Sequence, residues 1–258
     1  MNIALFFDLH TWLAGAIICF ARLAPVFFML PFLNTGVLTR VPRNAVIVLI
    51  GMALWPLNGP HLPALDSLAF AGLVLREVGI GVILGCLLSW PFWVLHAMGN
   101  LIDNQRGAML SSTVDPSNGV DTSELANFLN LFAAVIYLEA GGMRLLAETL
   151  AGSYALCSPV QTCHLQLAPL LGMLDPLVGK TLIISAPVVA TLLLSEALLG
   201  LLARYAPQMN AFSVSLTVKG AIALIVLLLY FGPHLPDEIL RMGHAVDAQQ
   251  WLHAERES

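Results

Sequence analysis

Charged residues are scarce in this sequence. They make up 10% of its 258 residues, whereas an ordinary soluble protein carries about 25%. Hydrophobic residues supply 58% of the chain, and the mean hydropathy is +0.84. A water-soluble fold cannot cover that much apolar surface, so the composition excludes an ordinary soluble domain. The chain is predicted to have the lipid bilayer, or a large apolar assembly, as its solvent.

Motifs for nucleic-acid binding, catalysis and metal binding are also missing. No basic stripe with interleaved aromatic residues is present, and the few charges behind the net charge of -5 are scattered. There is no phosphate-binding glycine loop, H-E-x-x-H, nucleophile elbow or C-x-x-C. His164 beside Cys163 lacks a second ligand pair at zinc spacing. We therefore expect no nucleic acid, cofactor or metal, and place an intramembrane enzyme below the other hypotheses.

Cysteine is limited to four positions. Cys19 and Cys86 lie inside apolar runs, whereas Cys157 and Cys163 share the polar break at 153–175. A disulfide between the latter two is possible in an oxidising compartment, but their spacing does not establish the geometry. Two free thiols are the expectation, and the disulfide stays open as the alternative.

Six apolar segments are present, with approximate limits 12–33, 45–57, 68–100, 125–152, 176–204 and 211–232. A spanning helix needs about 20 apolar residues. Two segments are longer than one crossing of the bilayer needs, and the segment 45–57 is too short for a full crossing. Six apolar segments therefore need not mean six membrane crossings. Prolines that are expected to kink or break helices lie in or beside these runs: Pro25, Pro31, Pro56, Pro91 and Pro187. The sequence predicts an all-α membrane protein with a membrane-associated domain at 1–232 and a polar tail at 233–258.

Orientation is predicted from the positive charges outside the apolar runs. Arg40 and Arg43 stand in the 34–44 break, whereas the breaks at 58–67 and 153–175 contain no Lys or Arg. The positive-inside rule makes the first break cytoplasmic and places the N-terminus and the 153–175 break outside. Because no basic region precedes the first apolar run, we expect that run to be retained rather than cleaved as a signal peptide.

Small residues mark a packing face. Gly81, Gly85 and Ser89 recur every four residues, so they stack on one helical face that another backbone can approach closely. We expect the helix that packs on this face to belong to the same chain, and a helix of another subunit is the alternative. Gly141 and Gly142 form a second flexible or tightly packed point.

Ionisable residues inside the apolar runs need partners or water. Arg144 and Glu148 are four apart and are expected to pair on one helix. For the others we expect contacts between segments or subunits, and Glu196 fits a packing anchor better than a proton carrier. These other residues are Arg22, Glu77, Glu139, Lys180, Glu196 and Lys219.

The longest internal polar break runs from Asn100 to Glu124 and is rich in turn-forming residues. Asp121 and Glu124 resemble a capping box, which predicts that the fourth helix begins there. A long loop in a compact membrane protein is usually functional, and an exposed connector is the competing interpretation.

Motifs spread along the chain together resemble the SctT/FliR family of type III export-gate subunits. The most specific is APQMNAF at 206–212, and the resemblance leaves only the tail after about residue 233 uncovered. The ending FSVSLTVKG at 212–220 is more similar to the virulence-type injectisome branch than to the flagellar branch. The other matching positions are Arg22, Pro25, Pro31, Arg40-Val41-Pro42, Glu77, Gly79, Gly81, Gly85, Gly99, Gln105, Gly107, Asp115, Pro116, Gly141-Gly142, Ser153-Tyr154 and Pro159.

The resemblance implies a pore-forming subunit of a hetero-oligomeric gate in the bacterial inner membrane. Its partners would be SctR-like and SctS-like subunits and an SctU-like switch protein, and unfolded secreted proteins would pass through the assembly. Such subunits have bent hairpins that need not span the bilayer. The rival hypothesis is a polytopic solute or ion transporter, which predicts an inverted repeat that we do not detect.

The family's channel plug maps to the loop between Gln105 and Asp121. The plug residues are then Gln105, Arg106, Gly107, Met109, Asp115, Pro116, Asn118, Gly119 and Asp121. We expect assembly and packing to depend on Gly81, Gly85, Ser89, Glu77, Glu196, Pro207, Gln208, Asn210 and Lys219.

Overall fold

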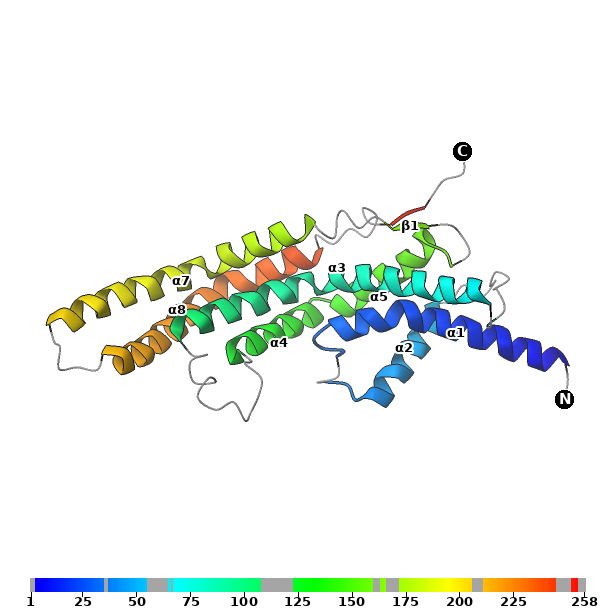
Figure 1. Ribbon diagram of the computed structural model, residues 1–258, viewed down its shortest axis with the longest axis horizontal. Coiled ribbons are helices and arrows are strands. Elements are labelled where there is room, and N and C mark those ends of the chain that lie inside the picture. Colours follow the sequence, from blue (N-terminus) through cyan, green and yellow to red (C-terminus); the bar gives the residue numbers. More distant parts are fainter. Residues whose placement is uncertain are drawn as a thin grey trace. The chain divides into compact units, whose positions relative to one another are not determined.

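A computed structural model describes residues 3–34, 37–54, 65, 67–107, 123–159, 163–165, 172–205, 211–244 and 252–254. This part of the chain is helical apart from two strands of three residues each (Figure 1). The helices are α1 (Ile3–Met29), α2 (Arg40–Leu54), α3 (Leu68–Arg106), α4 (Glu124–Glu139), α5 (Gly142–Leu156), α7 (Leu174–Tyr205) and α8 (Ala211–His244). Strands β1 (Cys163–Leu165) and β2 (Leu252–Ala254) pair antiparallel. The predicted all-α class is confirmed.

The chain folds into two compact units. The first contains residues 1–90, 141–173 and 243–258, and the second contains 91–140 and 174–242. Helix α3 passes from the first unit to the second at Pro91. The chain returns at Gly141, whose φ of 87° is a left-handed conformation that glycine adopts without steric cost.

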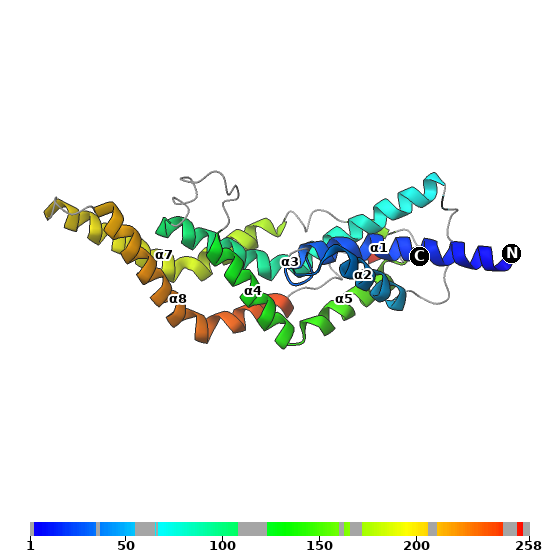
Figure 2. The same cartoon turned by 90° about the horizontal axis from the view of Figure 1, so that it is seen from below.

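The first unit is built around α1. Ile18, Leu23 and Phe27 of α1 are fully buried, as is Ile80 of α3. Helices α1 and α2 lie side by side in both ribbon views (Figures 1 and 2), and Gly51 permits this, because a Cβ atom there would lie 2.6 Å from the Cβ of Cys19. Close packing of this kind fixes the helices in one arrangement.

The second unit pairs α4 with the C-terminal part of α3, and α7 with α8. Phe92 and Tyr137 meet edge to face, with ring centroids 5.4 Å apart. Helices α7 and α8 run side by side in both views. Val188 and Leu192 of α7 and Leu227 of α8 are buried.

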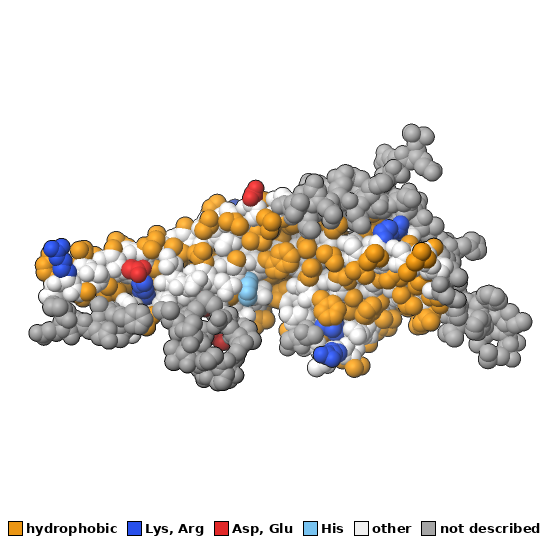
Figure 3. Space-filling model, in the orientation of Figure 1, with side chains coloured by type: hydrophobic (Ala, Val, Ile, Leu, Met, Phe, Trp, Pro, Cys, Tyr) orange, Lys and Arg blue, Asp and Glu red, His pale blue; other side chains and the backbone are white. Residues whose placement is uncertain are grey.

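Within the described residues, three helices are long and apolar enough to cross a membrane, and two bent helix pairs would raise the number to five if each pair is one span. These three candidate spans lie in α1, α3 and α7, but their burial differs greatly. The apolar window of α3 is 78% buried, whereas that of α7 is only 28% buried. Hydrophobic side chains cover much of the face that Figure 3 displays, with few charges among them. Helix α7 therefore presents its apolar surface to lipid or to other proteins.

Several predicted boundaries were wrong. Helix α3 does not end near residue 100 but continues to Arg106, because the polar segment after Gly99 can still form a helix whose Asp103 and Arg106 pair one turn apart. The segment 125–152 is two helices, α4 and α5, because the chain turns at Gly141.

Pro25, Pro91 and Pro187 lie inside helices, and Pro31 follows the end of α1, so that kinking at these positions stays a prediction. The basic residues near the N-terminus differ from expectation. Arg40 and Arg43 begin α2 instead of standing in a loop, and Arg43 is buried over the ring of Phe28. Helix α8 continues beyond residue 232 to His244, while the division into domain and tail stays a prediction.

Candidate assembly and gate site

A buried ion pair joins α1 to α3 in the first unit. Arg22 Nε donates to Glu77 Oε2 at 2.6 Å, and both side chains are fully buried. The same guanidinium donates to two groups of α5, the Ser153 hydroxyl at 3.3 Å and the Cys157 carbonyl at 2.7 Å. It also lies 4.1 Å from the centre of the Tyr154 ring. One side chain thus binds three helices together.

Arg76 extends this network to the chain that follows α5. Its Nη2 donates to Glu77 Oε1 at 3.0 Å and to the carbonyls of Ser158 and Pro159 at 3.3 and 2.7 Å. Two cations therefore share one carboxylate and face carbonyls at a helix C-terminus, where positive charge is favourable. The network therefore ties α1, α3 and α5 together through charge-assisted hydrogen bonds.

The predicted small-residue face of α3 packs against α1 of the same chain. A Cβ atom on Gly81 would lie 2.2 Å from the carbonyl oxygen of Arg22, and one on Gly85 would lie 2.6 Å from the sulfur of Met29. Ser89, the third member, is fully buried. The close approach brings the backbone of α1 next to Glu77 one turn away, so the glycine face and the ion pair form one contact region.

Cys157 stands at the edge of this region. It is disulfide-bonded and buried, so the expectation of a free thiol at this position was wrong. Cys19 and Cys86 are free thiols within the helices. His164 lies in β1, and the described part of the chain holds no group of His, Cys, Asp or Glu side chains that could bind a metal ion.

The two ends of the long loop meet in the second unit. Gln105 and Arg106 belong to the last turn of α3, and Gly107 follows with a φ of 79°. Asp103, only 1% exposed, accepts hydrogen bonds from Arg106 Nε at 2.7 Å, from the Ser123 hydroxyl at 2.5 Å and from the amide of Leu125 at 3.1 Å. The other predicted plug residues lie outside the described residues: Met109, Asp115, Pro116, Asn118, Gly119 and Asp121.

Helix α4 begins at Glu124, close to the start predicted from a cap at Asp121, but its cap differs. Ser123 is the N-cap, and its hydroxyl oxygen accepts from the amide of Ala126 at 3.0 Å. Ser123 directly precedes the helix, which is the position from which a hydroxyl reaches the third amide. The cap is therefore Ser123 and not Asp121.

Charged residues of α7 and α8 pair across the two helices. Lys219 Nζ lies 3.0 Å from Glu196 Oε2, and Lys180 pairs with Glu238. Glu196 is 58% exposed at its side chain, whereas Lys219 is nearly buried. The predicted signature residues Pro207, Gln208 and Asn210 lie outside the described residues.

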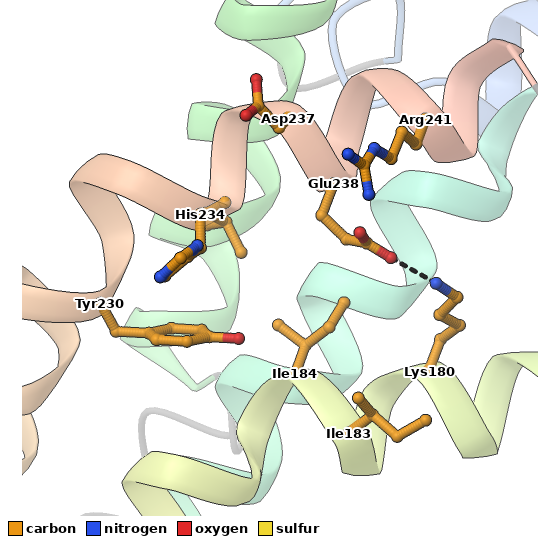
Figure 4. A pocket seen from close by; sticks show the side chains of 9 residues that line it. Lys180, Ile183, Ile184, Tyr230, His234, Asp237, Glu238 and Arg241 are labelled. Carbon is orange, nitrogen blue, oxygen red and sulfur yellow. Dashed lines mark hydrogen bonds and ion pairs between the residues drawn. The ribbon is translucent and has the colours of Figure 1, made fainter.

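A cavity of about 340 Å³ adjoins the Lys180–Glu238 pair (Figure 4). Its lining combines Ile183 and Ile184 of α7 with polar groups of α8 that include Tyr230. Positive and negative side chains are balanced around it, so its electrostatics favour neither an anion nor a cation.

Three further charged residues, Arg144, Glu148 and Glu139, are exposed. Arg144 and Glu148 form the predicted local pair, with 2.7 Å between Nε and Oε1 on an exposed surface. Glu139 is exposed at the end of α4. Five of the six charges singled out within the apolar runs have partners on other helices: Arg22, Glu77, Lys180, Glu196 and Lys219.

Sequence reasoning missed Asp103, Ser123 and Arg76. Two signals were available: serine is a preferred N-cap directly before a helix, and Asp103 stands three residues before Arg106 on one helix face. Nothing in the sequence identifies Ser123 as the partner of Asp103, because twenty residues separate them and the contact depends on how α3 and α4 pack.

Comparison with known proteins assigns the family. The family "Bacterial export proteins, family 1" matches residues 13–241. The chain is 53% identical to the surface presentation of antigens protein SpaR of Salmonella typhimurium, over 98% of this chain and 97% of that protein. It is 44% identical to SpaR of Shigella flexneri, over 88% of this chain and 89% of that one.

A flagellar relative is more distant. The flagellar biosynthetic protein FliR of Pectobacterium carotovorum is 27% identical, over 90% of this chain and 92% of its own. The higher identity to SpaR agrees with the predicted preference for the injectisome branch. The chain therefore belongs to the bacterial export proteins, family 1, and is a membrane-embedded SctT/FliR-type component of the type III secretion apparatus.

Proposed function

We propose that this protein is a structural subunit of the wall of the export gate, through which unfolded proteins cross the bacterial inner membrane. It would assemble with SctR-like and SctS-like subunits and adjoin an SctU-like switch protein. We assign it no enzymatic activity. The similarity to SpaR along nearly the whole chain supports this role over that of a solute or ion transporter.

The exposed surface of α7 is the structural observation that carries the proposal. This helix has the most hydrophobic of the candidate spans, yet most of it is not buried within the chain. Glu196 stands on it with more than half of its side chain exposed. A carboxylate facing hydrocarbon is costly, so water or another subunit is the favourable neighbour, as expected for a subunit that lines a protein-conducting assembly.

The first experiment tests assembly. The protein would be co-expressed with its SctR-like and SctS-like partners, purified in mild detergent and weighed by native mass spectrometry. We expect one complex that contains all three proteins. Recovery of this chain only as a free monomer, while the other two associate normally, would contradict the proposal.

We further propose that the loop between Gln105 and Asp121 closes the gate when no substrate passes. The described residues on either side of this segment, Arg106 and Ser123, both bind Asp103. Deleting residues 109–118 would leave 108 and 119–122 to connect Gly107 to Ser123. Five extended residues reach about 17 Å, so the deletion need not pull the helix ends apart.

The second experiment measures small-molecule flux through assembled gates in membranes, at equal complex abundance. We expect the 109–118 deletion to raise flux, because it removes contacts of the closed state. A variant with the same ten residues replaced by Gly and Ser serves as the control for length. An exposed connector predicts unchanged flux from both variants. Loss of assembly without leakage would instead make the loop a clamp between subunits.

A further inference from the structure

Arg43 is a buried cation that has no carboxylate partner among the described residues. Two other cations are buried in this part of the chain, and each is paired: Arg22 with Glu77, and Lys219 with Glu196. Arg43 is 3% exposed, and its Nε and Nη1 atoms are buried without a hydrogen-bond acceptor. A buried charge without a partner is costly. A negative charge from outside the chain would therefore stabilise this position.

The chain around Arg43 does not supply that negative charge. Between Asp8 and Asp66 the sequence contains no aspartate or glutamate. The ring of Phe28, whose centre lies 4.0 Å from the guanidinium carbon of Arg43, attracts the cation but does not neutralise it. Arg40, one turn earlier on α2, is exposed and adds a second positive charge. Positive charge therefore accumulates at the start of α2.

The same helix start also offers hydrogen-bond donors. The amide of Arg43 donates to the Thr39 carbonyl, and Pro42 has no amide hydrogen. Helix geometry leaves the amides of Arg40 and Val41 without a partner inside the helix. A helix N-terminus carries a partial positive charge and binds phosphate groups through such amides. Two arginines and two amides together are suited to a phosphate.

The outward side of α2 indicates which kind of phosphate compound fits. Val41 is 80% exposed and Leu49 is 69% exposed, and residues eight apart lie on one side of a helix. Another side of α2 packs on α1 at Gly51. A phospholipid would place its phosphate at the helix start and an acyl chain along Val41 and Leu49. A free phosphate, or a carboxylate alone, would leave these apolar side chains uncovered.

We propose that the start of α2 binds the head group of an acidic phospholipid. Arg40 and the amides of Arg40 and Val41 donate to the phosphate, and Arg43 supplies a fixed positive charge beneath it. Basic pockets between membrane helices bind acidic lipid head groups by the same combination of charge and apolar surface. The site goes beyond the proposed role in export and does not depend on it.

The first experiment is a lipid titration of the purified full-length protein in detergent. The melting temperature is followed as phosphatidylglycerol, phosphatidylcholine or inorganic phosphate is added. At a lipid concentration about one hundred times Kd, phosphatidylglycerol should raise the melting temperature by about 5–10 °C. Phosphatidylcholine with the same acyl chains should raise it less, because its choline offsets the phosphate charge. Inorganic phosphate should have little effect, because it has no acyl chain to cover the apolar side of α2.

The second experiment measures the affinity of variants for phosphatidylglycerol by native mass spectrometry. Arg43→Gln and Arg40→Gln should each weaken binding about fivefold or more, the contribution of one arginine near an acidic lipid. Arg144→Gln is the matched control, because Arg144 is exposed and already paired with Glu148. Its affinity for the lipid should equal that of the wild type.

The outcomes separate a lipid site from the alternatives. Unchanged affinity in both Arg43→Gln and Arg40→Gln, or equal stabilisation of the wild type by the two lipids, would overturn the proposal. Equal protection by inorganic phosphate would mean that the site binds phosphate without an acyl chain. If Arg43→Gln keeps its lipid affinity but no longer purifies with the SctR-like and SctS-like proteins, another subunit supplies the negative charge. Should Arg43→Gln fail to fold, Arg40→Gln, which changes an exposed side chain, decides alone.

Discussion

Replacing Glu77 by Gln tests whether the buried network around Arg22 holds the first unit together. The substitution keeps the size of the side chain and removes its charge. Arg22 then stays fully buried, and its partners are the amide oxygen of the new glutamine, the hydroxyl of Ser153, the carbonyl of Cys157 and the ring of Tyr154. None of these carries a negative charge.

The expected cost is large because the partner left behind is a buried cation. Breaking a buried ion pair on one side costs about 3–5 kcal/mol. Since each 1.4 kcal/mol corresponds to about tenfold in an equilibrium constant, the ratio of folded to unfolded protein should fall by a factor of roughly 10² to 4 × 10³. The total stability of a domain is only about 5–15 kcal/mol, so Glu77→Gln should lower both melting temperature and cellular abundance markedly.

The assay can use the protein's own thiols. Cys19 and Cys86 are free and buried, so a thiol-reactive fluorescent dye should report unfolding of the purified protein in detergent as the temperature rises. Glu148→Gln is the matched control, because Arg144 and Glu148 also form a pair at 2.7 Å but on an exposed surface. Exposed pairs contribute about 0–1 kcal/mol, so this variant should melt close to the wild type.

Two outcomes would refute the reasoning. Equal melting shifts from Glu77→Gln and Glu148→Gln would mean that burial does not set the cost. A melting temperature unchanged by Glu77→Gln would mean that Arg22 does not need the carboxylate. A third variant sharpens the test: the double replacement Arg22→Met/Glu77→Leu removes both charges and should be less destabilising than Glu77→Gln alone.

Three further predictions concern single positions. Gly81→Ala should reduce the yield of assembled complex more than Gly85→Ala, because the added methyl group meets the rigid backbone of α1 at Gly81 and the flexible end of Met29 at Gly85; equal yields would show that α1 can move away. Gly141→Ala should lower the free energy of unfolding by about 1–2 kcal/mol, because Gly141 has a left-handed backbone conformation that alanine adopts at a cost. Gly152→Ala on helix α5 should leave the melting temperature unchanged or raise it in the same assay, because no atom lies within 4 Å of the added methyl group. A thiol reagent added to the denatured protein should label Cys157 only after reduction, because the disulfide blocks this residue even when it is no longer buried; labelling of the denatured protein without reduction would contradict the disulfide.

Much of the fold could be predicted because apolar runs in a membrane protein have few alternatives to helix. Each of the six apolar segments contains a helix or a helix pair. The ends were harder to predict, since the polar segment after Gly99 forms a helix whose ends depend on Asp103 and Arg106. The Gly141-Gly142 pair was identified as a flexible or tightly packed point, but its sequence does not say that the chain ends one helix there and starts another.

The polar contacts could be predicted only in part, for a physical reason. A buried charge in an apolar run reveals that a partner must exist, so Arg22, Lys180 and Lys219 could be selected from sequence. Which partner each finds depends on helix packing across long separations, as with Arg22 and Glu77, which are 55 residues apart. Local pairs such as Arg144 and Glu148 need no tertiary information and were predicted directly.

Buried polar groups serve here to fix which helices meet. The Arg22 network lies wholly within the first unit and the Asp103 network wholly within the second, and the two share no residue. Apolar surfaces can slide past one another in a hydrophobic environment with little change in energy, because lipid is as apolar as leucine. A charged hydrogen-bonded group permits only one register. The sequence therefore places fully satisfied charges beside glycines, at Gly81 in one unit and Gly99 in the other, where close backbone approach and a specific bond together select a single arrangement of the helices.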